Sequence, residues 1–329
     1  MIRLAGSPEL YPLAFEGESV RLLRLSEAEY AAASFLDERL IGQVAEAGRM
    51  PFAELASAAE GLAGESDFIF HLGHVGSTLL ARLLGRSSTI FALREPAILR
   101  TLAWEAESAG RTGRLTVMLR LLARVWRPDQ RSLVKTTSFV SDLGGFCLEV
   151  ASSAKAILMV CGPQTFIAGI LAGEATLAEL APSTPRRLAR LAKRLGSAPA
   201  PPSGPGEMAA AAWTGEIASL GAIAKVYPSR VLWLDFDRFL ADPGSGLVRV
   251  LAHLGRRDDP ARLMGKGDLE RYSKAPEHAF DASDRAAILA SATVDRKSEI
   301  DRGIAWINRT ARQFPVLREA FALAGQGSK

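Results

Sequence analysis

A short turn that contains two glycines is the strongest chemical signal in the sequence. It lies between residues 68–72, a nearly continuous apolar run, and residues 79–84, a strongly helical segment. In chain order the turn reads Gly73-His74-Val75-Gly76-Ser77-Thr78. The N–H groups of such a turn, continued by those of a helix N-terminus, form a positive concavity that suits phosphate or sulfate. The plainer alternative is a tight strand-to-helix turn in which Ser77 caps the helix.

The turn is not a Walker A motif. That motif, G-x-x-x-x-G-K-S/T, requires a lysine directly after its last glycine, whereas Ser77 directly follows Gly76 here. The rest of the sequence offers no clear acidic residue for magnesium. A nucleotide kinase or another magnesium-dependent phosphoryl transferase is therefore a weaker interpretation of the same turn.

Strands and helices alternate around the turn. Short apolar runs predict buried strands at residues 68–72, 90–93, 132–135, 156–160 and 231–234. Helical patterns occupy residues 97–106, 115–126, 139–151 and 209–226. This alternation predicts an α/β fold, P-loop-like and three-layered (α/β/α), with a mainly parallel central sheet and extra helices at both termini. Ligands of such sheets bind beyond the carboxyl ends of the strands, which is where the turn falls.

The chain is expected to have three parts. Residues 1–65 form an N-terminal appendage, residues 66–260 the α/β core, and residues 261–329 a C-terminal helical tail that packs on the core. In the appendage, residues 20–25 suggest a strand. Helical patterns there cover residues 27–46 and 52–62.

One segment of the core is rich in proline and glycine. Residues 196–206 read GSAPAPPSGPG and predict a mobile loop. A basic helical face precedes this loop, and we expect it either to be solvated or to form a basic lid over an anionic ligand. Its members are Arg186, Arg187, Arg190, Lys193 and Arg194.

Composition narrows the class of protein. The 329 residues are 48% hydrophobic and 23% charged, which excludes a disordered chain, a fibre and a disulfide scaffold. A net charge of +4 gives little support for a nucleic-acid partner. Cys147 and Cys161 lie in apolar stretches and predict buried thiols in a reducing compartment. The N-terminus lacks the apolar segment of a signal peptide, and residues 156–171 are too short to span a bilayer, so we expect a cytoplasmic protein without a membrane partner.

The turn and its surroundings resemble the 5′-phosphosulfate loop of the sulfotransferases, whose donor is 3′-phosphoadenosine-5′-phosphosulfate (PAPS). That loop commonly reads R-S-G-S/T-T or K-S-G-T-T, and here G-H-V-G-S-T-L-L stands between a strand and an amphipathic helix. Leu93-Arg94-Glu95-Pro96 is similar to the family's acidic segment after the second strand. Residues 231–255 are similar to its late strand, acid, D-P turn and closing helix. The resemblance covers roughly residues 67–255. It implies transfer of a sulfuryl group from PAPS to a hydroxyl or amine, without a metal.

This sequence departs from the family pattern at two places. The loop cation of the family aligns with His74 or Val75, so the loop brings no permanent charge. The family's second donor motif binds the 3′-phosphate through an arginine and a serine, and the matching positions here hold Cys161 and Gly169. Neither residue neutralises a phosphate. Either another cation replaces the arginine, or the donor is bound differently, or the protein is not an active sulfotransferase.

Three side chains near the turn are candidates for catalysis. Lys135 ends a predicted strand, so it either points into the ligand crevice as a sulfonate or phosphate ligand or is a surface lysine. Glu95 precedes Pro96 and either removes the acceptor's proton or supplies the charge before a helix N-terminus. His74 either donates to the ligand's bridging oxygen or is a half-buried loop histidine. The donor-binding residues implied by these arguments are Gly73, His74, Val75, Gly76, Ser77, Thr78, Lys135 and Lys274.

The other polar and aromatic residues have plainer interpretations. His71 lies within a strand and is expected to be structural, and Asp235 and Asp237 are expected to cap a helix or form a turn. Lys274 and His278 belong either to a loop that folds over the nucleotide or to ordinary surface. The tryptophans expected in the core are Trp104, Trp126, Trp213 and Trp306.

Two alternatives to an active sulfotransferase stay open at this stage. They are a catalytically degenerate nucleotide- or anion-binding protein of the same fold and, with less support, a P-loop-type phosphotransferase. The acceptor of a sulfotransferase would be a small molecule, a glycan or a peptide, and the sequence does not choose among them or fix the oligomeric state.

Overall fold

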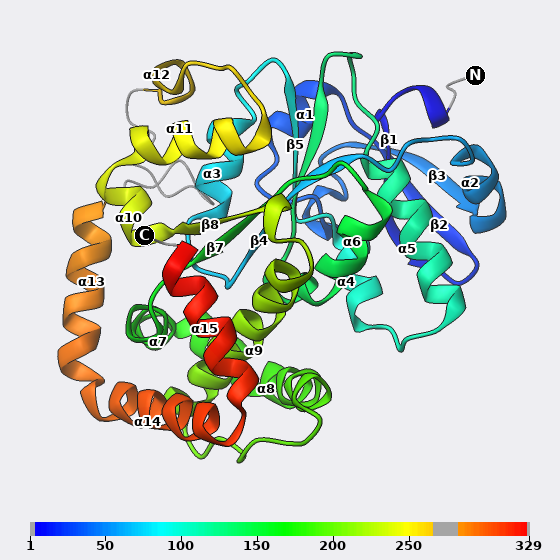
Figure 1. The fold of residues 1–329 in the computed structure, drawn as a ribbon. Coiled ribbons are helices and arrows are strands. Elements are labelled where there is room, and N and C mark those ends of the chain that lie inside the picture. Colours follow the sequence, from blue (N-terminus) through cyan, green and yellow to red (C-terminus); the bar gives the residue numbers. More distant parts are fainter. Residues whose placement is uncertain (1–3, 266–281, 328–329) are drawn as a thin grey trace.

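The fold is built around one parallel sheet, which Figure 1 shows at the centre of a computed structural model that describes residues 4–265 and 282–327. Its strands are β4 (Ser66–His71), β5 (Ile90–Arg94), β6 (Arg131–Lys135), β7 (Ala156–Val160) and β8 (Val231–Asp235). They pair in the order β5-β6-β4-β7-β8, all in parallel. Every residue of β4, β5 and β7 is buried, as the apolar runs in the sequence predicted.

Helices connect these strands. Between β4 and β5 lies α3 (Ser77–Leu84), and between β5 and β6 lie α4 (Ala97–Trp104) and α5 (Ala109–Leu122). Between β6 and β7 lie a 3₁₀ helix (Ser138–Leu143) and α6 (Gly144–Val150). Between β7 and β8 lie α7 (Pro163–Ala172), α8 (Glu174–Leu195) and α9 (Pro205–Val226). After β8 come α10 (Phe236–Ala241), α11 (Pro243–Leu254) and α12 (Pro260–Leu263).

The strand order gives the sheet a switch point. The connection from β4 to β5 runs toward one edge of the sheet, whereas the connections from β6 to β7 and from β7 to β8 run toward the other. Because such crossovers are right-handed, α3 lies on one face of the sheet and α6 and α9 lie on the opposite face (Figure 1). The predicted P-loop-like three-layer α/β fold is thereby confirmed, and the loop after β4 stands at the switch point where ligands of such sheets bind.

A second, antiparallel sheet forms the N-terminal part. It pairs β1 (Leu10–Glu16), β2 (Ser19–Arg24) and β3 (Ala45–Pro51) in that order, with α1 (Glu27–Ala32) and α2 (Phe52–Ala58) beside it. The helix expected over residues 27–46 is wrong, since α1 ends at Ala32 and the chain returns as β3. The helix expected over residues 52–62 is correct in type but ends at Ala58.

A buried arginine of the core explains why α1 stops early. The Arg94 guanidinium donates to the carbonyl oxygens of Tyr30 (2.5 Å), Ala31 (2.9 Å) and Ala33 (2.7 Å). Carbonyls at the end of α1 thus find their partners in the core, and the chain leaves the helical path to pair Leu36 N–H with the Arg94 carbonyl. The local sequence carries no sign of this long-range contact.

The basic face of α8 is docked rather than solvated. Arg190 and Arg194 pair with Asp142 in the 3₁₀ helix after β6, and Arg187 pairs with Glu216 of α9. The side chains of these three arginines are 19–27% exposed, whereas Arg186 and Lys193 are mainly exposed. The expectation of a solvated face is therefore wrong for three of its five members. Arg190 and Arg194 hold α8 against the segment that follows β6, and Arg187 holds it against α9.

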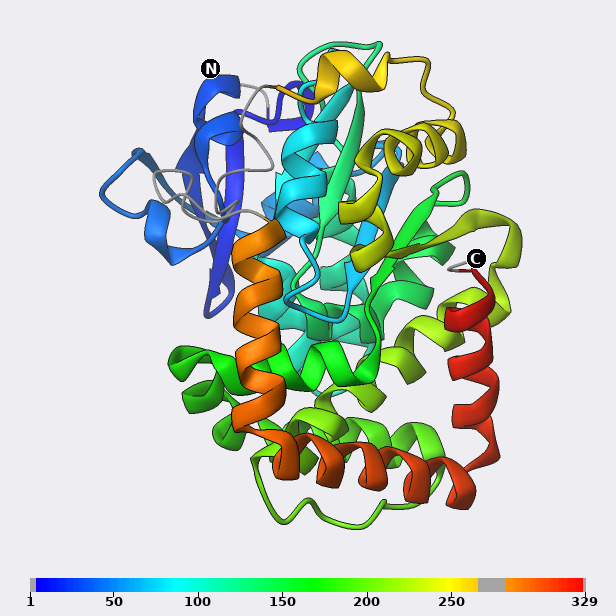
Figure 2. The ribbon, with the colours of Figure 1, turned by 90° about the vertical axis from the view of Figure 1, so that its left-hand side faces the viewer.

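In its described residues 282–327, the C-terminal tail consists of helices, as the sequence predicted. They are α13 (Ala282–Asp295), α14 (Lys297–Gln313) and α15 (Pro315–Gly327). Figure 2 shows α13 rising along one side of the core, α14 crossing beneath it, and α15 rising on the other side. The loop at residues 196–206, expected to be mobile, has fixed contacts with this tail, since Trp306 Nε1 donates to the Ala200 carbonyl at 3.0 Å. None of the helices among the described residues is both long and apolar enough to cross a membrane.

Two glycines, Gly206 of α9 and Gly303 of α14, make the contact between these two helices possible. A Cβ atom on Gly206 would lie 1.9 Å from the Glu299 carbonyl oxygen, whereas a Cβ atom on Gly215 of the same helix would meet nothing within 4 Å. We expect Gly206→Ala to lower the free energy of unfolding by about 2 kcal/mol or more, because the two backbones must move apart. Gly215→Ala, the matched control, should raise it by up to about 1 kcal/mol through helix propensity. Urea unfolding measures both, and equal effects of the two variants would contradict this packing.

Candidate functional site

The loop between β4 and α3 combines left-handed backbone conformations with unused N–H groups. Gly73, His74 and Gly76 all have left-handed backbone angles, with φ of 90°, 56° and 61°. Among residues 4–265 and 282–327, the N–H groups of residues 75–78 donate to no carbonyl oxygen. The helix begins at Ser77 with Gly76 as its N-cap, so the alternative in which Ser77 caps the helix is wrong. The loop therefore offers a row of donors that the described part of the protein does not use.

A buried hydroxyl lies in the first turn of α3, at the end of this row. Thr78 is 2% exposed, and its Oγ1 atom has no hydrogen-bond partner within the described chain. A buried hydroxyl without a partner costs about 1–3 kcal/mol, which a protein retains where a ligand supplies the partner. Ser77 is also buried, at 5% exposed. The loop and its hydroxyls together suit a tetrahedral oxyanion.

A histidine of β4 holds the start of this loop in place. Nδ1 of His71 accepts a hydrogen bond from the Gly73 N–H at 2.9 Å, and Nε2 lies 2.7 Å from the Thr136 carbonyl oxygen. Because Nδ1 accepts, the proton sits on Nε2 and the ring is neutral in this arrangement. His71 is therefore structural, as the sequence suggested. His74 is exposed, so its interpretation as a half-buried loop histidine is wrong.

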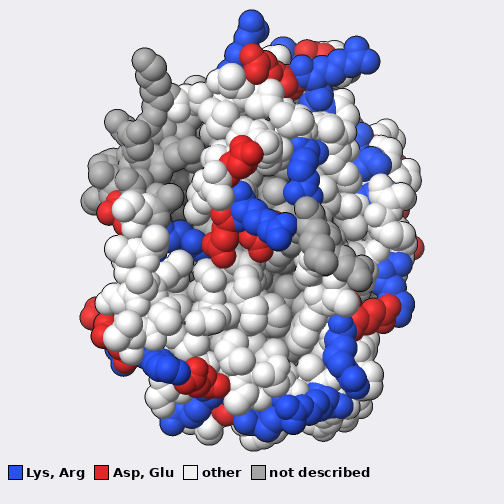
Figure 3. Space-filling model, turned by 60° about the vertical axis from the view of Figure 1, so that its left-hand side comes forward, with Lys and Arg blue, Asp and Glu red and all other residues white. Residues whose placement is uncertain are grey.

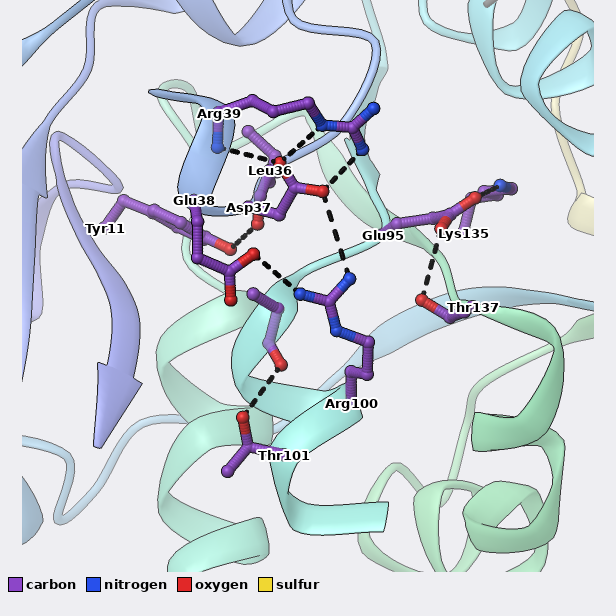
Figure 4. Close-up of polar contacts among 11 residues, drawn as sticks. Tyr11, Leu36, Asp37, Glu38, Arg39, Glu95, Arg100, Thr101, Lys135 and Thr137 are labelled. Carbon is purple, nitrogen blue, oxygen red and sulfur yellow. Dashed lines mark hydrogen bonds and ion pairs between the residues drawn. The ribbon is translucent and has the colours of Figure 1, made fainter. Parts of the chain in front are cut away.

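Lys135 and Glu95 meet at the carboxyl ends of neighbouring strands. Strands β5 and β6 pair Arg94 with Lys135, so the next residue, Glu95, lies beside the lysine. Its carboxylate forms an ion pair with Lys135 Nζ and accepts a hydrogen bond from Thr137 Oγ1 at 3.2 Å (Figure 4). The lysine side chain is 1% exposed and that of Glu95 is 15% exposed. Lys135 is therefore a buried ammonium and not the surface lysine of the alternative interpretation.

The backbone of Glu95 is in an unusual conformation. Its φ of 52° lies in the left-handed region, which disfavours residues with a Cβ atom. The helix α4 begins at Ala97, its N-cap is Pro96, and no side chain caps it. Glu95 thus directs its carboxylate to Lys135 and not to the helix N-terminus. Strain of this kind persists where the surroundings enforce it, and it is common at functional sites.

The pair and the loop belong to the same edge of the sheet. Thr136 donates its N–H to the Ile69 carbonyl at 3.1 Å, and a Cβ atom on Gly73 would lie 3.6 Å from Ser138 Oγ. The segment that follows Lys135 therefore runs beside the start of the loop. The structure places Lys135 and Glu95 at the same edge of the sheet as the turn.

Sequence reasoning missed a polar cluster from the N-terminal part that lies beside Glu95. Arg39 donates from its backbone N–H (3.1 Å) and its Nε (2.8 Å) to Asp37 Oδ1, and Arg100 of α4 donates to Glu38 at 2.7 Å (Figure 4). The hydrogen bonds to Asp37 raise the pKa of Arg39, and the charge of Glu95 adds to this rise. The prediction of one long helix over these residues concealed the cluster. Its only signal in the sequence was the run of charges Asp37-Glu38-Arg39.

The two positions of the second donor motif remain without a cation of their own. Cys161 is buried, and burial raises the pKa of its thiol, so the group is neutral. Its carbonyl oxygen accepts a hydrogen bond from Trp213 Nε1 at 3.1 Å. The other position, Gly169, contacts the tail, since a Cβ atom there would lie 3.7 Å from Leu289 Cδ2.

The structure describes most of the other residues that the sequence singled out. Asp235 caps α10 by accepting from the Arg238 N–H at 3.0 Å, as expected, whereas Asp237 pairs with Arg285. Lys274 and His278 lie outside the described residues. Within the described chain, no three histidine, cysteine, aspartate or glutamate side chains are grouped to hold a metal ion. Trp213 and Trp306 are buried core residues, whereas Trp104 and Trp126 are half-buried.

Known proteins resemble this chain in structure. No protein-family model matches it, and no curated protein matches it by sequence. The sulfotransferase domain from the curacin biosynthetic pathway is 14% identical, with a TM-score of 0.40 over 74% of this chain and 97% of that domain. A sulfotransferase from Alicyclobacillus acidocaldarius is 16% identical, with a TM-score of 0.39 over 74% of this chain and 96% of its own. One from Mycobacterium tuberculosis H37Rv is 14% identical, with a TM-score of 0.42 over 75% and 81%.

The Lys135–Glu95 pair makes a prediction for stability. Glu95→Gln leaves a buried ammonium without its counter-charge and should lower the free energy of unfolding by about 3 kcal/mol. Lys135→Met should cost less, because Glu95 keeps Thr137 and some contact with solvent. In the double variant the loss should be smaller than the sum of the single losses by about 2 kcal/mol. Urea unfolding of the four proteins gives this coupling energy, and strictly additive losses would show that the two side chains do not interact.

Proposed function

We propose that the protein is a sulfotransferase, which moves a sulfuryl group from PAPS to a hydroxyl or amine acceptor. The observation that carries the proposal is the loop between β4 and α3. The N–H groups of residues 75–78 and the buried Thr78 hydroxyl find no acceptor in the described part of the chain. Donors of this kind bind an oxyanion, and they stand at the position where the sequence resembles a 5′-phosphosulfate loop.

The composition of the loop favours sulfuryl over phosphoryl transfer. P-loop phosphoryl transferases place a lysine directly after the last glycine of the loop, and Ser77 holds that position here. The permanent charge beside this loop comes instead from Lys135, at the end of a neighbouring strand.

The ion pair of Lys135 and Glu95 suits the chemistry of the transfer. An O–S bond to a hydroxyl acceptor, or an N–S bond to an amine, forms as the S–O bond to the donor phosphate breaks, and the electron pair of the broken bond stays on the phosphate oxygen. Glu95 accepts the proton that the acceptor loses, and Lys135 stabilises the charge that develops on the leaving oxygen. Lys135 can shift from Glu95 toward an anion in the loop, which frees the Glu95 carboxylate to act as the base. The partial exposure of Glu95 gives an acceptor access to it.

One observation favours a second candidate, an anion-binding protein without catalysis. The buried thiol of Cys161 stands where the resembling family places an arginine for the 3′-phosphate.

We further propose a cytoplasmic protein that acts on a small molecule, a glycan or a peptide. The low net charge, and the mixture of acidic and basic side chains on the face in Figure 3, agree with a partner other than nucleic acid.

Binding of adenosine 3′,5′-bisphosphate tests the anion site directly. Isothermal titration calorimetry should detect binding to the full chain, and Thr78→Val should weaken it about tenfold through the loss of one hydroxyl donor. Thr112→Val, which removes an exposed hydroxyl from α5, is the matched control and should have no effect. Absence of binding to the full chain at millimolar nucleotide would refute the proposal.

Turnover separates the enzyme from the binding protein. With PAPS and a panel of phenols, alcohols and amines, the full chain should release adenosine 3′,5′-bisphosphate. Glu95→Gln should lower kcat about 100-fold or more, because the base is lost. Its affinity for the bisphosphate should not fall, because Lys135 is then no longer paired to a carboxylate. Nucleotide binding without turnover on any acceptor would favour the second candidate.

A further inference from the structure

We propose that the guanidinium of Arg39 binds an acidic group of the acceptor, so that the molecule whose hydroxyl or amine meets Glu95 also carries a carboxylate. This inference rests on the proposed transfer reaction and names the class of its second substrate. The assigned residue belongs to the N-terminal part of the chain, outside the α/β core that supplies the loop and Lys135.

Backbone hydrogen bonds fix the segment around Leu36 directly beside Glu95. The Leu36 N–H donates to the Arg94 carbonyl oxygen at 2.7 Å, and the Leu36 carbonyl oxygen accepts from the Ala97 N–H at 2.9 Å. Arg39 follows three residues later, and Figure 4 shows its side chain extending from the backbone toward the side on which Glu95 lies. After the hydrogen bonds to its neighbouring carboxylate, the charge of Glu95 is among the causes that raise the pKa of Arg39. The two side chains are therefore close enough to act on one acceptor.

The Arg39 guanidinium is held in a defined orientation by two neighbours. Its Nε donates to Asp37 Oδ1 at 2.8 Å, and its Nη2 donates to Asp37 Oδ2 at 2.5 Å. The guanidinium carbon also lies 3.7 Å from the centroid of the Phe35 ring. Because the Asp37 side chain is only 6% exposed, the carboxylate that anchors the arginine is itself fixed in the fold. A donor group oriented in advance loses little conformational entropy when it binds a ligand.

The other edge of this guanidinium is available to a ligand. Because Nε and Nη2 face Asp37, Nη1 and the second N–H of Nη2 point away from that carboxylate. Nη1 has no acceptor among residues 4–265 and 282–327, and the Arg39 side chain is 60% exposed. Two N–H groups on one edge of a guanidinium match the two oxygens of a carboxylate, which gives a bidentate pair.

The charges around this edge favour an added anion. Arg100 Nη1 lies 4.0 Å from Asp37 Oδ2, so one buried acid stands between two guanidinium groups. The second guanidinium is paired with Glu38, whose side chain is 57% exposed, and exposed ion pairs of this kind break at little cost. The charge of Glu95, which would repel a second anion, is balanced by Lys135. The site therefore favours an acceptor with a negative charge over a neutral or cationic one.

Pairs of acceptors that differ mainly in one carboxylate test the assignment on the full chain. The probes are 3-(4-hydroxyphenyl)propionate against 4-ethylphenol, and glucuronate against glucose, each with PAPS. Release of adenosine 3′,5′-bisphosphate gives kcat/KM, which for the acid of at least one pair should be about tenfold higher than for its neutral partner. The pair that shows the preference tells whether the acid belongs to an aromatic or a sugar acceptor.

Substitutions of Arg39 assign the preference to its guanidinium. Arg39→Gln should lower kcat/KM for the acid about tenfold and change the value for the neutral partner less than about twofold. Arg39→Lys should retain part of the preference, because it keeps the charge but not the two donors on one edge. Arg49→Gln is the matched control and should change neither value. Arg49 is likewise an exposed arginine of the N-terminal part, paired there with Glu16.

The outcomes separate this inference from the proposed function. Equal kcat/KM values within both pairs, or a preference that survives Arg39→Gln, overturn the assignment and leave the transfer reaction standing. An equal loss for acid and neutral partner also overturns it, because Arg39 would then only support the chain beside Glu95. If the protein turns over no acceptor, the proposed function fails. Calorimetry of the two acids with the bisphosphate-loaded protein then decides, since binding abolished by Arg39→Gln retains the acid site and absence of binding overturns it. An unchanged Kd for the bisphosphate verifies that each variant is folded.

Discussion

The conformation of the candidate site depends on one neutral, buried histidine. The ring of His71 joins the last residue of β4 to the Thr136 carbonyl after β6 and to the Gly73 N–H at the start of the loop. Both contacts require the same tautomer, so the ring acts as a rigid spacer between two chain segments. The loop held at Gly73 continues through left-handed residues, and its N–H groups at residues 75–78 donate to no carbonyl oxygen of the described chain. The unused N–H groups of the loop therefore depend on the contact that His71 makes between the ends of β4 and β6.

At the same edge of the sheet, the N-terminal part contacts the residues next to Glu95. Arg94, whose pKa burial lowers to about 10, binds carbonyls at the end of α1 and immediately precedes the strained Glu95. Leu36 and Ala97 continue the connection, since each takes part in a backbone hydrogen bond across this junction. Loss of the N-terminal part would therefore disturb the Lys135–Glu95 pair as well as expose the sheet edge. The appendage is a structural support of the site.

The strands of the core could be predicted from the sequence, whereas the structure of the segments around the core could not, and both results have a physical cause. Buried parallel strands must be continuously apolar, so all five could be found from local sequence, and the turn after the first could be found from its glycines. The helix predicted over residues 27–46 was wrong because Arg94, which is distant in sequence, donates hydrogen bonds to carbonyl oxygens at the end of α1. The solvated face predicted for α8 was wrong because Asp142, the partner of its arginines, lies on another element. Local patterns report which residues are buried, but they do not report which distant group will bury them.

The charged side chains near the loop come from other elements of the fold. The loop itself supplies only neutral donors, which orient an oxyanion but give a field of short range. The strand pairing places Lys135 of β6 at this edge of the sheet, where the Glu95 carboxylate holds it. Pairing with Glu95 limits the cost of burying this cation. Any anion bound at the loop would compete with Glu95 for Lys135, which disfavours simple anions that make no other contact.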